Sequence, residues 1–175
     1  MSTDVLPSIL ETNVFTALRT FILSLVACEV IRTQINRVAM PKGDFIAMTQ
    51  LRAVPLETNT HTYTATSETI LRPTQFDIQI DSYGASAADR AQTIATLLRD
   101  DIACQSFLAS GFDIQPLYAG DAHQMPLVTG EEQYLERWTF ECSLQINPTI
   151  TQTISSANTL AVSGMVDVDR AYPPS

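Results

Sequence analysis

Few side chains in this sequence have the types and spacing that catalysis or metal binding requires. The two histidines, His61 and His123, have no partner at helical or other short spacing, so we expect them in surface or loop positions. Ser86 lies in YGASA, which lacks the second glycine of a nucleophile elbow, and we interpret it as a helix cap. No spacing among the six glycines matches a dinucleotide-binding or phosphate-binding loop.

The acidic residues form no pair suited to acid–base chemistry. Glu131 and Glu132 are adjacent, so a strand would point them to opposite faces. Asp167 and Asp169 share a strand face, but two solvated acids explain them better than a cation site does. We therefore predict a protein that is not an enzyme, with no catalytic residue, no cofactor and no metal ion. A site assembled from residues distant in the sequence stays open as an alternative.

The composition is that of an acidic globular chain. Its 175 residues suffice for one domain with a core, and 45% of them are hydrophobic. The net charge of −9 and the scatter of the ten basic residues argue against direct binding to nucleic acid. The three cysteines, Cys28, Cys104 and Cys142, are an odd set in apolar surroundings, which favours buried thiols in a reducing compartment over disulfides or a zinc site.

Two amphipathic helices are expected. Asn13 can cap the first, whose apolar run Val14–Ile31 is interrupted by an arginine and a glutamate and so predicts a core helix rather than a membrane span. Its stripe recurs at steps of three and four: Val14, Phe15, Leu18, Phe21, Ile22, Leu25 and Val26. Ser86 begins the second helix and Gly111 stops it. The inner stripe of that helix is Ala88, Ala91, Ile94, Ala95, Leu98 and Ile102.

The remaining segments alternate as strands do. We predict strands at Phe45–Val54, Gln75–Gly84, Ile114–Tyr118 and Gln133–Asn147, with a further candidate near Leu160–Val168. Threonine at positions 58, 60, 62, 64 and 66 favours an extended segment with neither face strongly apolar. We expect this segment at a sheet edge, where another chain can pair with it.

The order of helix, strands, helix and strands indicates the α+β class. We predict an antiparallel β-sheet with two main helices packed on one face. A single domain is expected over residues 1–154, and residues 155–175 form a C-terminal strand or arm of uncertain role.

Four stretches, in this order, carry a resemblance to a known family. They are LRTFILSLV with NRVAMPKGDFIAMT, QFDIQIDSYG with ADRAQTIATLLRDDIAC, QPLYAGDAHQMPLVTGEEQYLERW, and LQINPTIT. Together they span roughly Leu18–Thr151, and the order and spacing resemble the phage neck (tail) terminator family of contractile-tailed phages and prophages.

The resemblance implies a structural role in the virion. Terminators of this kind form a ring, typically of six copies, that closes the tail and docks the head–tail connector around the genome channel. The implied partners are copies of the same chain, tail tube and sheath proteins and the connector, while DNA passes without specific binding. The implied location is the virion neck, after assembly in the host cytoplasm, with no membrane association.

A head-to-tail ring requires two different surfaces on each subunit, because unlike faces of neighbouring copies meet. We assign one surface to the turn Asn36–Asp44, which holds the only lysine of the chain. Its candidate residues are Asn36, Arg37, Met40, Pro41, Lys42, Gly43 and Asp44. The complementary candidates are Asp100, Asp101, Glu131 and Glu132, with Tyr134 and Arg137 as further interface candidates. An ordinary loop with solvated charges is the open alternative for the turn.

Two other functions are compatible with the same pattern. Within the virion, the chain could be another neck or connector subunit, or a subunit associated with the tail tube or sheath. Outside it, the chain could be a soluble cytoplasmic ligand-binding or enzymatic domain, with a pocket between the sheet and the Ala119–Gly130 loop and with Asp121 and His123 at its mouth.

Overall fold

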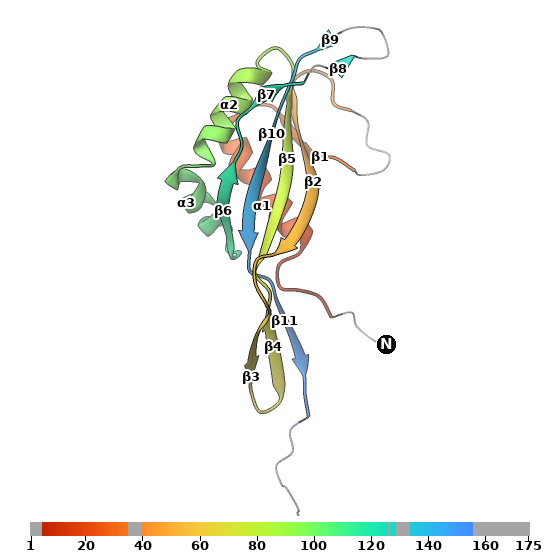
Figure 1. Ribbon diagram of the computed structural model, residues 1–175. Helices are drawn as coiled ribbons and strands as arrows, with labels where there is room; N and C mark the ends of the chain where they lie inside the picture. Colours follow the sequence, from red (N-terminus) through yellow and green to blue (C-terminus); the bar gives the residue numbers. More distant parts are fainter. Residues whose placement is uncertain (1–4, 35–39, 126, 129–133, 156–175) are drawn as a thin grey trace, which may run out of the picture.

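The large sheet of the computed structural model organises the whole chain (Figure 1). The structure describes residues 5–34, 40–125, 127–128 and 134–155. The strand order of the large sheet is β1-β2-β5-β10-β6, with β7 also paired to β10. The bounds are β1 Glu29–Arg32, β2 Phe45–Pro55, β5 Thr74–Tyr83, β6 Ile114–Ala119, β7 His123–Gln124 and β10 Arg137–Ile146.

Three helices and two smaller sheets complete the described fold. The helices are α1 Glu11–Leu25, α2 Ala87–Leu97 and α3 Asp101–Ala109. A three-stranded sheet of order β11-β4-β3 comprises β3 Thr60–Tyr63, β4 Ser67–Leu71 and β11 Thr149–Thr153. A two-stranded ribbon pairs β8 Leu127–Val128 with β9 Tyr134–Leu135. This mixture of helices and a mostly antiparallel sheet confirms the predicted α+β class.

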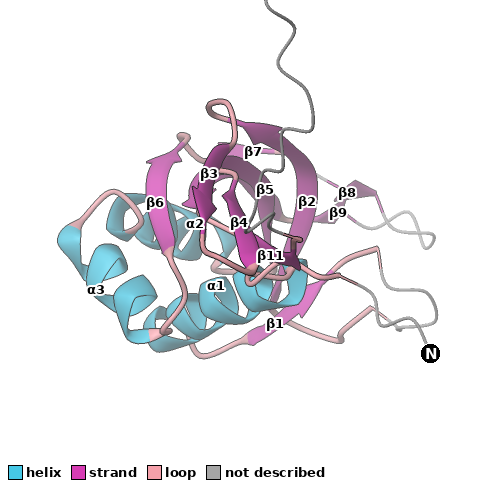
Figure 2. Ribbon diagram, turned by 90° about the horizontal axis from the view of Figure 1, so that it is seen from below, coloured by secondary structure: helices cyan, strands magenta, loops and turns pink. Residues whose placement is uncertain are grey.

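One core joins the helices to the sheet. Figure 2 shows the three helices together on one side of the large sheet. The apolar alternation of β5 and β10 points into this core, as predicted, through Phe76, Ile78, Ile80, Phe140, Cys142, Leu144 and Ile146. The stripe on α1 is also confirmed, and its buried members are Val14, Phe15, Leu18, Phe21 and Ile22. The opposite face of β5 and β10 carries mainly polar side chains, but Tyr83 packs there with Phe45 and Ala47 of β2 in a second, small cluster.

The first predicted helix is shorter than expected and begins earlier. It starts at Glu11 rather than Val14, and Asn13 is the third helical residue rather than the N-cap; its side chain accepts a hydrogen bond from the backbone N–H of the N-cap residue Leu10 at 2.7 Å. It ends at Leu25, and β1 then pairs in parallel with β2. This parallel pair makes the large sheet mixed. The helix does not continue through EVIR, because the β-branched residues of this segment favour a strand and its backbone hydrogen-bonds to β2. In the described residues, no helix is both long and apolar enough to cross a bilayer.

The second predicted helix is two helices. The chain leaves the helical conformation at Asp100, which is extended at φ −109° and ψ 163°. The carboxylate of Asp100 accepts a hydrogen bond from the Ile102 N–H at 3.4 Å and so caps α3. An aspartate competes with the helix for backbone groups, which explains why the helix breaks here. Gly111, at φ +77°, follows the end of α3 as predicted.

The three-stranded sheet forms an arm that projects from the body (Figure 1). It continues three long strands of the body, since β2 leads into β3, β4 into β5, and β10 into β11. All residues of β3 are exposed, which confirms the exposed edge strand expected from the threonine alternation. The sequence pattern did not predict β11, because Asn147 and Pro148 indicate the end of a strand. The chain nevertheless forms a new strand directly after Pro148. The candidate strand near Leu160–Val168 lies outside the described residues.

Cys142 is expected to resist thiol reagents until the protein unfolds. It is 1% exposed, and burial raises the pKa of its thiol to about 12, with the charges of Asp77 and Glu141 adding to the rise. Cys28 and Cys104 are half-buried rather than fully buried as expected. Maleimide labelling at about pH 8, followed by mass spectrometry, should therefore modify these two first. Equal labelling rates at all three thiols would contradict the packed core.

Candidate subunit interface

The described part of the predicted turn is exposed and sharply shaped. Lys42 and Gly43 are exposed, and the Met40 side chain is 58% exposed. Gly43 has φ +92°, a conformation that favours glycine, and it lies directly after the lysine. The structure thus presents one apolar and one cationic side chain at this turn. Asn36 and Arg37 lie outside the described residues, so their interface role stays a prediction.

Asp44 anchors the turn to the rest of the subunit. Its carboxylate Oδ2 accepts a hydrogen bond from Arg90 Nη1 of α2 at 2.8 Å. Arg90 Nη2 also donates to the Tyr83 carbonyl at 2.7 Å. Gly84 allows this approach: a Cβ there would lie 1.8 Å from Asp44 Oδ1, and its φ is +102°. The anchoring role of Arg90 and Gly84 has no signal in the sequence, because only the folded chain brings them to the turn.

The predicted acidic residues Asp100 and Asp101 border a groove between α3 and β6. Both side chains are exposed, although Asp100 is also the cap of α3. The groove has a volume of about 330 Å³. Its lining residues are Leu98, Arg99, Asp100, Asp101, Cys104, Pro116, Leu117 and Tyr118. Leu117 and Tyr118 are 47% and 60% exposed, so this edge offers apolar area next to carboxylates.

Arg99 shapes the same groove from inside the subunit. Its Nε donates to the Ala119 carbonyl at 2.5 Å, and its Nη2 donates to Asp121 Oδ1 at 3.1 Å. The guanidinium also lies 5.3 Å from the centre of the Tyr118 ring. Arg99 thus makes its polar contacts within the subunit, and the exposed Asp100 and Asp101 side chains border the same groove.

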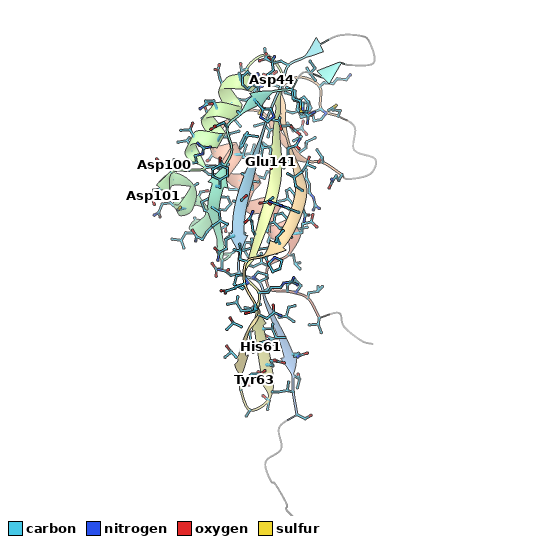
Figure 3. All side chains as sticks on the ribbon, viewed as in Figure 1. Asp44, His61, Tyr63, Asp100, Asp101 and Glu141 are labelled. Carbon is cyan, nitrogen blue, oxygen red and sulfur yellow. The ribbon has the colours of Figure 1, made fainter. Side chains whose placement is uncertain are left out.

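The turn and the groove lie at different places on the subunit: the turn precedes β2 at one end of the large sheet, where Asp44 contacts Arg90 of α2, and the groove lies beside the edge strand β6. The chain enters the turn from β1, one edge strand, whereas α3 packs on β6 at the other edge. Figure 3 labels Asp44 at one end of the molecule and Asp100 and Asp101 on the side of α3. A head-to-tail contact needs this arrangement, because each copy must present unlike surfaces to its two neighbours.

The remaining interface candidates are less accessible or lie outside the described residues. The Arg137 side chain is 20% exposed, donates to Asp81 Oδ1 at 3.0 and 3.1 Å, and lies 5.8 Å from the centre of the Tyr83 ring. Its charge is thus used inside the subunit. The backbone of Tyr134 pairs with Val128 in the small ribbon. Glu131 and Glu132 lie outside the described residues, and the interface role of all four stays a prediction.

The sheet face opposite the helices holds a network of paired charges. Burial would raise the pKa of Asp77, but hydrogen bonds from Ser143, Arg52 and Gln75 outweigh it and hold that pKa below its ordinary value. Ser143 donates to Asp77 Oδ1 at 2.6 Å. Glu141 on the same face is exposed (Figure 3). On this face, Asp77 and Asp81 are therefore paired with arginines, and Glu141 is exposed to solvent.

The arm has two chemically different faces. Side chains alternate across its strands, and one face carries hydroxyl groups: Thr60, Thr62, Ser67, Thr69, Thr149, Thr151 and Thr153. On the other face, His61 Nδ1 lies 2.7 Å from Glu68 Oε1, and Gln152 Nε2 donates to Glu68 Oε2 at 2.6 Å. Hydrogen bonds from His61, Gln152 and Tyr63 lower the pKa of Glu68. His61 is thus a surface histidine held in a local network (Figure 3).

Asp121 and His123, the residues expected at the mouth of a ligand pocket, form no metal-binding group with other described residues. His123 is exposed in β7 and pairs with Thr139 of β10, while Asp121 is exposed and bound to Arg99. Within the described ranges, no group of three histidine, cysteine, aspartate or glutamate side chains could hold a metal ion. The two residues expected at a pocket mouth therefore lie on the surface of this edge.

Comparison with known proteins agrees with the sequence resemblance. The family described as phage neck terminator protein matches residues 12–168, which include every described helix and strand except the first residue of α1. Among curated proteins, no match was found. The family match covers most of the 175 residues and confirms the resemblance carried by the four stretches. The chain belongs to the phage neck terminator protein family, whose role is structural and whose place is the virion neck.

Proposed function

We propose that copies of this chain assemble head to tail into a ring of six, which closes the tail at the neck and docks the head–tail connector. The observation that carries this proposal is the separation of two unlike exposed surfaces on the subunit, one at the end of the sheet before β2 and the other beside the edge strand β6. The turn surface offers Met40 and Lys42, and the groove surface offers carboxylates beside apolar side chains. Membership of the neck terminator family supports the location.

The two surfaces complement each other in charge and in polarity. The Lys42 ammonium of one copy can meet Asp100 or Asp101 of the next, and Met40 can cover the exposed Leu117 and Tyr118. The apolar contact supplies most of the binding free energy, whereas the rim charges set the register and exclude wrong partners. Glu131 and Glu132 are the second candidate partners for the turn.

The acidic balance of the chain suits a conduit for DNA. With a net charge of −9, a ring of copies repels a polyanion unless a basic lining is built into its channel. We propose that the lumen is negative and that DNA passes through it without specific contacts. The tail tube and sheath on one side and the connector on the other are the proposed partners, with assembly taking place in the host cytoplasm.

Charge reversal at the turn tests the proposal. The variant Arg37→Glu with Lys42→Glu should leave the folded monomer intact and abolish rings, because like charges would then face each other across the contact. Negative-stain images of purified tails mixed with wild-type protein should show closed rings capping the tails at one end. The same mixture with the variant should leave the tails uncapped, while circular dichroism melts stay unchanged. Normal rings from the variant would overturn the charge assignment.

A charge swap identifies the partner acids. Adding Asp101→Lys to the reversed turn should restore rings if α3 is the partner, and this change spares the cap at Asp100. Adding Glu131→Lys with Glu132→Lys should restore them instead if the second candidate is correct. Wild-type protein located away from the tail end in the same images would favour a connector or tube-associated subunit.

A further inference from the structure

The arm is a sheet without a core of its own. Every residue of β3 is exposed, four of the five residues of β11 are exposed, and none of the five residues of β4 is fully buried. A small sheet usually needs an apolar face packed on another layer to be stable. The arm instead projects away from the body (Figure 1). One of its faces carries mainly hydroxyl groups, and the apolar side chains Ile70 and Ile150 on the other face have no further layer of the described residues packed on them. It is therefore a structure that a neighbouring molecule would stabilise.

Both outer strands of the arm have backbone groups directed outwards. Thr64 N–H bonds to the Ser67 carbonyl, so by alternation the N–H and C=O groups of His61 and Tyr63 point away from β4. On β11, the Thr149 backbone bonds to Ser8 on its outer side, so the outward groups further along are those of Thr151 and Thr153. No other strand of the described residues pairs with β3 or β11.

These two edges lack the features that usually prevent pairing. β3 reads THTY and β11 reads TITQT, so neither has a proline, a lysine or an acidic side chain. The edge strand β6 of the body differs, because Pro116 interrupts its row of donors. The edges of the arm are thus suited to accept a strand.

We propose that β3 of one copy pairs with β11 of the next copy, so that neighbouring arms form a continuous sheet; this inference rests on the proposed ring. The two strands run in the same direction, since each is antiparallel to β4, and the new pair is therefore parallel. The pairing extends the hydroxyl face without a break, from Thr60 and Thr62 to Thr151 and Thr153. On the other face it brings Tyr63, 63% exposed, next to Gln152 and brings Ile150, 37% exposed, next to His61, and buries part of both Tyr63 and Ile150.

The position of the arm agrees with a second copy as the occupant. Figures 1 and 2 both show β3 displaced towards the side of β6 and β11 displaced towards the side of β1. The proposed ring joins the β6 side of one subunit to the turn after β1 of the next. The arm contact and the body contact would then form between the same two neighbours, with no change in symmetry.

Two matched pairs of edge variants test this inference. His61→Pro and Thr151→Pro each remove an outward N–H, whereas His61→Val and Thr151→Val keep it. On purified tails, both proline variants should lower the fraction of capped tails about tenfold, and both valine variants should cap tails as the wild type does. Capping by either proline variant at the wild-type level would overturn the β3–β11 contact, and an effect at His61 alone would indicate pairing of β3 with itself.

Hydrogen exchange on the wild-type chain gives a second measurement that does not depend on the folding of a variant. Outward amides at His61, Tyr63, Thr151 and Thr153 should exchange quickly in the free subunit and about tenfold more slowly, or slower still, in the ring. Slow exchange already present in the free subunit would show that another segment of the same chain covers the edge, which overturns the inference. Wild-type rings with rapid exchange at these amides would reject the arm contact alone, and the absence of rings would reject the proposed function with it.

Discussion

Replacing Phe107 by alanine is expected to lower the free energy of unfolding by about 3–5 kcal/mol. Phe107 is fully buried on α3 and packs on Phe21 of α1, with ring centroids 5.9 Å apart and planes at 29°. The only other fully buried residue of α3 is Ala103. The nine-residue helix is too short to be stable alone, so its attachment to the body depends mainly on this one ring.

Chemical denaturation of the purified variant measures this effect. Leu108→Ala is the matched control, because Leu108 is the next residue of α3 and is 66% exposed. We expect the control to change the free energy of unfolding by less than about 0.5 kcal/mol. Similar losses in the two variants, or a loss below about 1 kcal/mol at Phe107, would contradict the described packing of α3. Because α3 begins at Asp101 and is capped by Asp100, the variant should also cap tails poorly at temperatures where the body is still folded.

The main elements of the fold could be predicted where periodicity was long and unambiguous. β10 alternates apolar and polar side chains over its ten residues and β5 alternates from Gln75 to Asp81, and this period predicts a strand. The polar face of β5 is nevertheless buried at Asp77 and Asp81, because hydrogen bonds satisfy these carboxylates there. β1 could not be predicted, because four residues after an apolar helix carry no periodic signal and its partner β2 starts a dozen residues later. The division of α2 from α3 could not be predicted either, because the apolar residues before and after Asp100 fit one continuous helix. The break is accompanied by a side-chain hydrogen bond at Asp100, which a periodic pattern does not reveal.

The candidate site was predictable only as separate stretches of sequence. A lone lysine between proline and glycine marks an exposed turn, and Lys42 is indeed exposed. The pairing of Arg137 with Asp81 was not visible, because it requires the register in which Thr139 lies opposite Asp81 on antiparallel strands. A strand pattern shows that these two side chains point to the same polar face but does not show that they meet.

Replacing Gly84 by alanine is expected to lower the free energy of unfolding by about 2–3 kcal/mol. About 1–2 kcal/mol comes from placing a side chain at a φ of +102°. The rest, about 1 kcal/mol, comes from displacement of Asp44, whose carboxylate would have to leave the space of the new Cβ and with it the hydrogen bond from Arg90. Thermal and chemical denaturation of the variant measure the sum.

Gly43→Ala separates the two causes. Gly43 has a similar φ of +92°, but a Cβ at this position would have no neighbouring atom within 4 Å, so the variant should show the backbone cost alone, about 1–2 kcal/mol. In an Asp44→Ala background, the cost of Gly84→Ala should fall towards that of Gly43→Ala, because the carboxylate is gone and only the tight contact of the Cβ with the Cα of residue 44, at 3.2 Å, remains. Equal effects of Gly84→Ala with and without Asp44 would show that Asp44 does not pack there. The proposed ring adds a consequence: Gly84→Ala should impair capping of tails more than Gly43→Ala relative to its loss of stability, because it releases the anchor that holds Lys42 and Met40 at the subunit surface.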